Sequence, residues 1–347
     1  MKNPPLIDLH EDISSYYVMG AGEQGFPVAD FREDLESRHG DIPKYRRANV
    51  RLVFASIFPM LSTLNSRLSA QLTKGYRGSY RALSPRSSST AVFEHIKAYY
   101  SLAEANPRDL LIVRDKDDVA RCFRSRVTGL LMSLEGAEAL EDTSDIGVLY
   151  NLGLRALGLT WNYDTRYSAT CMSKRDYGLT GEGQALLEEM NRLGVIVDLA
   201  HASRRTGMAV LGASRLPVFV THANARSVQD HARNLDDEYL ASLKEKRGVV
   251  GFVFASGMIG GKRNLDELVN HVMYVYEKFG PNNIGIGTDF FGLGARAPPG
   301  LEDITKVKDV WEALLDKGMK QSDVDKLSYK NALRVIEANA SRWRPYS

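Results

Sequence analysis

Short apolar segments recur along the whole chain, and most are followed by a segment with helical periodicity. The apolar segments are rich in Val, Ile and Leu and do not alternate strictly with polar residues, which is typical of strands buried on both faces. The pattern predicts eight strands, at Leu6–Leu9, Leu52–Ile57, Gly129–Leu134, Ala156–Thr160, Val195–Leu199, Val218–Thr221, Val249–Phe254 and Ile284–Gly287.

The segments between these strands carry apolar residues at helical spacing. The clearest predicted helices are Ala91–Ala105, Ser144–Leu152, Gly183–Leu193, Arg204–Ala213, Asp236–Lys246 and Leu265–Phe279. A repeated order of strand and helix favours a parallel sheet, and eight strands are enough to close that sheet into a barrel. We therefore predict an α/β protein with a (β/α)₈ TIM barrel fold that spans residues 1–347 as one domain.

Three regions need separate interpretation. The stretch at about 59–89 is rich in Ser, Arg and Gly, and it is interpreted as an insertion after the second strand, either a mobile lid or decoration. A polar, aromatic loop, 162–180, follows the fourth strand. The segment Gln321–Ala340 is predicted to be one helix on the outside of the barrel, with Ser322 as its N-cap.

Composition and charge change this picture little. The 347 residues are 44% hydrophobic and 25% charged, which is close to the globular average. The net charge of +2 gives no reason to expect nucleic acid as a partner. Two cysteines, no secretory leader and no long apolar run lead us to expect free thiols, a cytoplasmic location and no membrane contact.

Histidines and carboxylates stand at the carboxyl ends of most predicted strands. In a (β/α)₈ barrel all these ends meet at one face, so residues far apart in sequence converge there. His10 and Asp12 are one residue apart and are therefore expected to point the same way. The full set is His10, Asp12, Glu135, His201, His222 and Asp289.

Histidine nitrogens and carboxylate oxygens together suit Zn²⁺ and similar divalent metals, and the absence of cysteine ligands argues against a closed structural zinc site. An open site indicates catalysis. Glu135 is placed to bridge two metals, with His10 and Asp12 on one side and His201 and His222 on the other. A hydroxide between the metals would be the nucleophile, because metals lower the pKa of water to about 7.

Other interpretations of these residues exist. A lone histidine is more often structural than a ligand, and this is what we expect for His39, His95 and His271, which lie outside strand ends. Glu135 could instead be a helix N-terminal charge ahead of Gly136.

Several motifs, in order along nearly the whole chain, resemble the membrane (renal-type) dipeptidases of the amidohydrolase superfamily. They include Asp8-Leu9-His10-Glu11-Asp12, Leu134-Glu135-Gly136, Gly178-Leu179-Thr180, Asp198-Leu199-Ala200-His201, Thr221-His222-Ala223-Asn224-Ala225-Arg226, His231-Ala232-Arg233-Asn234-Leu235 and Gly287-Thr288-Asp289-Phe290. The resemblance implies a barrel of the metal-dependent hydrolase type, two zinc ions per chain and a homodimer.

The resemblance also implies residue roles. One zinc would be bound by His10, Asp12 and Glu135, and the other by Glu135, His201 and His222. Asp289 would be the acid/base group and Arg233 would hold the carboxylate of a dipeptide, which suits the guanidinium fork. An ion pair of Arg233 with Asp236 or Asp237 is the alternative.

Two positions depart from the family's pattern. Where many members have an oxyanion-stabilising histidine, this chain has Trp161 followed by Asn162, so either another group compensates, with Asn162 and Tyr163 the nearest candidates, or the preferred substrate differs. Trp161 could equally form an apolar wall beside the substrate. Phe291 stands where the family often has an aspartate, which puts the surroundings of Asp289 in doubt.

The expected function is therefore hydrolysis of dipeptides by a binuclear zinc site. Two alternatives stay open. The same barrel could hydrolyse other small amides, N-acyl amino acids or lactones, since one fold hosts many chemistries. It could also be a weakly active binding or maturation protein.

Overall fold

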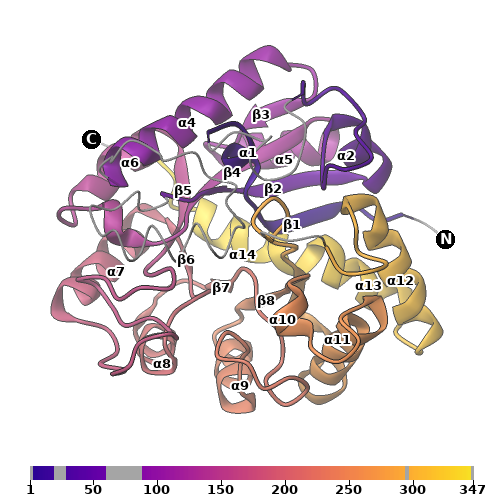
Figure 1. Ribbon diagram of the computed structural model, residues 1–347. Coiled ribbons are helices and arrows are strands. Elements are labelled where there is room, and N and C mark those ends of the chain that lie inside the picture. Colours follow the sequence, from indigo (N-terminus) through magenta and orange to yellow (C-terminus); the bar gives the residue numbers. More distant parts are fainter. Residues whose placement is uncertain (1–2, 19–28, 60–87, 294–296, 345–347) are drawn as a thin grey trace.

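The computed structural model describes residues 3–18, 29–59, 88–293 and 297–344. Most of the predicted insertion at 59–89 lies outside these residues. Within them the chain forms a sheet of parallel strands surrounded by helices (Figure 1). The strands are β1 Leu6–Glu11, β2 Val50–Ile57, β3 Leu110–Ile112, β4 Thr128–Leu134, β5 Leu154–Gly158, β6 Ile196–Asp198, β7 Phe219–Val220, β8 Val249–Phe252 and β9 Ile284–Ile286.

Eight of these strands close into a barrel in the order β1-β2-β4-β5-β6-β7-β8-β9, because β2 pairs with β4 and β9 pairs with β1. β3 lies outside the ring and pairs with the first residues of β4, whereas β5 pairs with its last residues. The predicted (β/α)₈ barrel is confirmed. β3 was not predicted, because three apolar residues are too short a pattern to recognise.

Helices cover the outside of the barrel (Figure 1). Two predicted helices, α8 and α11, have the expected bounds, and each begins after a side-chain cap, Ser203 and Asn264 respectively. The α-helices are α1 Ile13–Val18, α2 Ile42–Ala48, α4 Ser88–Ala105, α5 Lys116–Arg124, α6 Asp145–Asn151, α7 Gly181–Leu193, α8 Arg204–Ala213, α9 Asp237–Glu245, α10 Ser256–Ile259, α11 Leu265–Phe279, α12 Val307–Asp316, α13 Gln321–Asp325 and α14 Asn331–Ala340.

The C-terminal segment differs from its prediction. The helical stretch is divided into α13, a π-helical turn at Lys326–Lys330, and α14. The prediction of Ser322 as N-cap was wrong: the extended residue Lys320 occupies that position, without a side-chain cap hydrogen bond. In the π turn, the Ser328 hydroxyl donates to the carbonyl of Pro5, which ties this turn to the start of β1.

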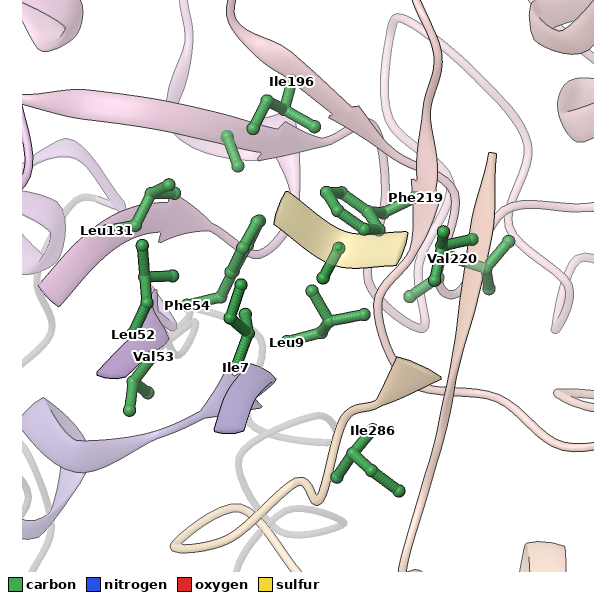
Figure 2. Close-up of a cluster of buried hydrophobic side chains, with 14 of the residues drawn as sticks. Ile7, Leu9, Leu52, Val53, Phe54, Leu131, Ile196, Phe219, Val220 and Ile286 are labelled. Atoms are coloured by element: carbon green, nitrogen blue, oxygen red, sulfur yellow. The ribbon is translucent and has the colours of Figure 1, made fainter. Parts of the chain in front are cut away.

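The barrel interior is a packed core. Phe54 of β2 and Phe219 of β7 come from opposite sides of the ring and meet edge to face, with ring centroids 5.2 Å apart. Leu9, Ile7 and Ile196 lie around them (Figure 2). Since apolar side chains fill the middle of the barrel, the space for a site lies at the ends of the strands. No helix among the described residues is both long and apolar enough to traverse a lipid bilayer.

Candidate active site

The six predicted site residues lie together at the carboxyl end of the barrel. Five are buried, and the Asp289 side chain is 20% exposed. His10 lies in β1, and Asp12 directly follows this strand. The strands β4, β6, β7 and β9 are followed by Glu135, His201, His222 and Asp289, respectively.

Glu135 lies at the centre of this cluster. Its Oε1 is 3.0 Å from Nε2 of His201 and 3.5 Å from Nε2 of His222, and its Oε2 is 3.8 Å from Nε2 of His10. His10 Nε2 is in turn 3.4 Å from Oδ2 of Asp12. The side chain of Glu135 faces the histidines, so the alternative of a simple helix N-terminal charge does not describe it.

Two groups that share Glu135 have the composition and spacing to hold a metal ion. Each residue of a group offers one ligand atom, and these atoms lie within 4.8 Å of one another. One group is His10, Asp12 and Glu135; the other is Glu135, His201 and His222. These are the two ligand sets that the sequence predicted, and their binding of metal stays a prediction.

The hydrogen bonds around His201 and His222 favour a cation between them. Nδ1–H of His201 donates to Oδ1 of Asn162 at 2.7 Å. The Thr221 hydroxyl donates to Asp198 and therefore accepts from Nδ1–H of His222 at 3.0 Å. Each Nε2 then carries a lone pair, and the two Nε2 atoms are only 3.0 Å apart beside the Glu135 carboxylate. Such lone pairs repel one another unless a cation accepts them.

In the group of His10, Asp12 and Glu135, several buried polar atoms have no hydrogen-bond partner among the described residues. Nδ1 and Nε2 of His10 and Oδ1 of Asp12 are buried and form no hydrogen bond within the described residues. A buried polar atom without a partner lowers stability. A divalent cation at this place would be coordinated by Nε2 of His10 and by the carboxylate of Asp12.

The charges of the site favour cations. Burial alone would lower the pKa of His10, but Glu135, Asp12 and Asp289 outweigh burial and raise it to about 10. Burial raises the pKa of Glu135 well above its ordinary value and that of Asp289 to about 7. Burial, together with Arg233 and His10, lowers the pKa of His201 and His222, so both stay neutral and able to bind metal.

Two aspartates that the sequence analysis did not select hold the ends of the strands. Asp198 accepts hydrogen bonds from the amide and hydroxyl of Thr221, at 2.9 and 2.6 Å. Asp8 accepts from the amide and hydroxyl of Thr288, at 2.9 and 2.7 Å. The signal was present in the sequence, since a threonine directly precedes both His222 and Asp289.

His201 and Asp289 both have left-handed backbone conformations, with φ of 65° and 64°. Non-glycine residues rarely adopt this conformation, and it is concentrated at functional sites. The carbonyl of His201 accepts from the amide of Cys171 at 2.7 Å, and the amide of Asp289 donates to the carbonyl of His10 at 3.0 Å. These contacts fix both turns.

Phe291 has a structural role in the same turn. Its amide donates to Nδ1 of His39 at 2.9 Å, and the ring of His39 stacks on Phe290 with centroids 4.9 Å apart. His39 thus holds the residues that follow Asp289. Its structural role agrees with the expectation for histidines outside strand ends. His95 and His271 also belong to hydrogen-bond networks, with Ser14 and with the backbone respectively.

Trp161 and Asn162 have different surroundings. The ring of Trp161 lies 6.0 Å from that of His201, 4.9 Å from Phe58 and 5.6 Å from Tyr163. Trp161 is therefore part of an aromatic group beside the predicted metal ligands, as the interpretation of an apolar wall requires. Asn162 directs its oxygen at His201, so this atom orients a predicted metal ligand.

Arg233 is 8% exposed, yet no carboxylate of the described residues lies within ion-pair distance of it. Its guanidinium donates to the carbonyl of His222 at 3.3 Å. The alternative of an ion pair with Asp236 or Asp237 was wrong, because Asp236 pairs with Arg204 and Asp237 with Lys278. A cavity of about 180 Å³ lies beside Arg233 and His201.

A parallel (β/α)₈ barrel with buried histidines and carboxylates at the carboxyl ends of its strands defines a metal-dependent hydrolase. Comparison with known proteins gives the family. The chain belongs to the membrane dipeptidase family, peptidase family M19, whose family model matches residues 1–344. The resemblance seen in the sequence motifs is thus confirmed, and the protein is placed among the metal-dependent dipeptide hydrolases.

Individual relatives agree with this assignment. The chain is 32% identical over 250 residues to dipeptidase tcpJ of Claviceps purpurea, an alignment that covers 70% of this chain and 59% of that protein. It is 29% identical over 341 residues to dipeptidase verJ of Clonostachys rogersoniana, covering 96% and 84% respectively. A metallopeptidase from Rhodobacter sphaeroides, liganded with a phosphinate mimic of the dipeptide L-Ala-D-Ala, has the same fold, with a TM-score of 0.82, 23% identity and coverage of 97% of this chain and 100% of that one.

Proposed function

We propose that this protein is a binuclear zinc dipeptidase in which His10, Asp12, Glu135, His201 and His222 bind the metals. The observation that carries the proposal is an imbalance of charge at two neighbouring places, with too few cations at one and too few anions at the other. Three buried or partly buried carboxylates, those of Asp12, Glu135 and Asp289, surround His10, and the buried guanidinium of Arg233, which has no carboxylate partner among the described residues, lies near them. Cations at the first place and a substrate carboxylate at the second would compensate both.

When bound, the two cations supply Lewis acidity, which lowers the pKa of water to about 7 and polarises a carbonyl oxygen. Arg233 binds the carboxylate of the dipeptide with its guanidinium fork and thereby orients the scissile bond. Asp289 accepts a proton from the attacking water. After the C–N bond breaks, Asp289 gives this proton to the leaving amine.

The environment of Asp289 suits this proton transfer. Its Oδ1 is 3.8 Å from Nε2 of His10, and its side chain keeps some access to solvent. A pKa of about 7, raised by burial, places the group near the operating pH, where it can both take and release a proton.

The length of the substrate is limited by Arg233. A single carboxylate anchor next to the metal ligands fixes the distance from the chain end to the scissile bond, so tripeptides would present the wrong bond. Trp161 would cover one side of the substrate, because its ring lies beside His201.

The test is hydrolysis of a matched panel after loading with Zn²⁺, Mn²⁺ or Co²⁺, together with metal analysis per chain. We expect two metals per chain, cleavage of dipeptides and little cleavage of tripeptides, with His201→Ala inactive. Equal cleavage of longer peptides would contradict the carboxylate anchor. Absence of metal-dependent turnover would favour the alternative of a binding or maturation protein.

A second candidate, hydrolysis of N-acyl amino acids, is favoured by the same Arg233, since these compounds also end in a carboxylate. Lactones without a carboxylate are less favoured for that reason. We further propose a cytoplasmic homodimer. The two free cysteines, Cys122 and Cys171, suit a reducing compartment, and the dimer rests on the family resemblance.

A further inference from the structure

A cavity of about 510 Å³ lies at the opposite end of the barrel from the metal ligands. Val50 and Thr128, the first residues of β2 and β4, form part of its wall, whereas the candidate active site lies beyond the last residues of the strands. α2 and α5 pack beside β2 in this region (Figure 1). The volume falls in the range of small-molecule pockets, which is about 300–1,000 Å³.

Five arginines and one carboxylate line this cavity. They are Arg46, Arg47, Arg51, Arg108, Arg126 and Asp109. The net charge of the whole chain is only +2, so this concentration of positive charge does not follow from a generally basic protein.

Two of the arginines have ordinary explanations. Arg46 forms an ion pair with Asp109, and Arg47 binds Asp34 through two hydrogen bonds of 2.5 and 2.9 Å. Both also lie in the last turn of α2, where a positive charge is favourable next to the helix dipole.

The other three arginines have no carboxylate partner in the part of the chain that the structure describes. Across the described ranges, no carboxylate is within ion-pair distance of Arg51, Arg108 or Arg126. Arg51 donates to the carbonyl of Ser125 at 2.7 Å. The side chains of Arg108 and Arg126 make no hydrogen bond to any described residue. Burial and the nearby positive charge of Arg126 lower the pKa of Arg51, as expected for like charges without an anion between them.

We propose that this cavity is a second binding site, which takes a small bisphosphorylated molecule held by Arg51, Arg108 and Arg126. Each phosphate group carries about −1.5 to −2 charges near neutral pH, so two such groups balance three guanidiniums. The guanidinium fork matches phosphate geometry through two parallel hydrogen bonds. The cavity opens to solvent where Arg108 and Arg126 are exposed, and its volume matches that of a small molecule.

The test is calorimetric titration of the metal-loaded protein with fructose 1,6-bisphosphate as probe, at fixed ionic strength. We expect one saturable site per chain and no binding of fructose. The double variant R108M/R126M should bind the probe at least about tenfold more weakly, because it loses charge-assisted hydrogen bonds. Arg121, an exposed residue of α5 that does not line the cavity, provides the matched control R121M. Its affinity should not change.

Other results would overturn the proposal. These are absence of saturable binding, or equal weakening in R121M and R108M/R126M. Tighter binding of the tricarboxylate tricarballylate would assign a carboxylate ligand instead. Tighter binding of single-stranded RNA or of phosphatidylserine vesicles, lost in R108M/R126M, would assign a macromolecular surface. Dipeptide hydrolysis by R108M/R126M should equal that of the unmodified protein, which separates this site from Arg233.

Discussion

Nδ1–H of His201 donates a hydrogen bond of 2.7 Å to Oδ1 of Asn162, and this bond leaves the lone pair of Nε2 directed at Glu135 and His222. Replacing Asn162 by Leu keeps the approximate shape of the side chain but removes the acceptor. We expect the affinity for metal to fall about 10–100-fold, as for other residues that orient a ligand histidine. Competition with a chelating dye measures this change.

Asn162→Asp is the matched control, because it keeps an oxygen toward Nδ1 and removes the amide donor. If Asn162 acts by orienting His201, this variant retains metal affinity and most of kcat. A large loss of kcat with full metal content would instead assign Asn162 to the reacting oxygen of the substrate, in place of the family's histidine.

Arg233→Met removes the buried guanidinium that has no carboxylate partner among the described residues. Hydrogen bonds to charged groups contribute about 1.5–3 kcal/mol, so KM for dipeptides should rise about 10–100-fold. Steady-state kinetics with a dipeptide and its C-terminal amide provide the comparison. The amide should be a poor substrate of both proteins, and an equal rise of KM for both would contradict carboxylate binding. Arg233→Lys retains the charge but loses the fork, and we expect an intermediate KM.

Asp289→Asn removes the proposed proton carrier without removing a member of either metal-binding group. Because general acid–base catalysis contributes typically about 10²–10⁴-fold, kcat should fall by this factor while KM changes little. The measurement is kcat together with metal content per chain. Loss of metal in this variant would show that Asp289 holds a cation instead of moving a proton.

The sequence predicted the barrel, and which histidines and carboxylates would lie together at one end of it, for a physical reason. Buried parallel strands have a recognisable composition, and each site residue lies near the carboxyl end of one of them, as Glu135 does directly after β4. Contacts that depend on neighbouring strands could not be predicted in this way. The support of Thr221 by Asp198 and the contact of His39 with Phe291 join residues whose proximity only the closed barrel creates.

Removal of metal should lower stability. Without cations, Nε2 of His201 and of His222 face each other at 3.0 Å and the carboxylates of Asp12 and Glu135 share the charge of His10. A ligand at 100 times its Kd stabilises the folded state by about 2.7 kcal/mol, so chelation should lower Tm by several degrees. Differential scanning calorimetry before and after chelation measures this. His201→Ala should show a smaller response, and an equal response would place the metal elsewhere.

Stability should also fall with acid, in part through His39. Burial, together with the charge of Lys44, lowers the pKa of His39 from its ordinary 6.5 to about 3. Between these values the unfolded chain binds a proton that the folded protein excludes, so the stabilising contribution is complete above pH 6.5 and is lost as the pH falls toward 3. This one histidine gives a slope of up to about 1.4 kcal/mol per pH unit.

His39→Gln tests this slope, because glutamine retains an oxygen that can accept from the Phe291 amide but does not titrate. The free energy of unfolding should be measured by denaturant titration of both metal-free proteins between pH 4 and pH 7. The other titrating groups are common to both proteins, so their contributions cancel in the difference. We expect the slope of the unmodified protein to exceed that of the variant by up to about 1.4 kcal/mol per pH unit. Parallel curves would show that folded His39 titrates like an exposed histidine, and its neutral Nδ1 would then not be what holds the turn after Asp289.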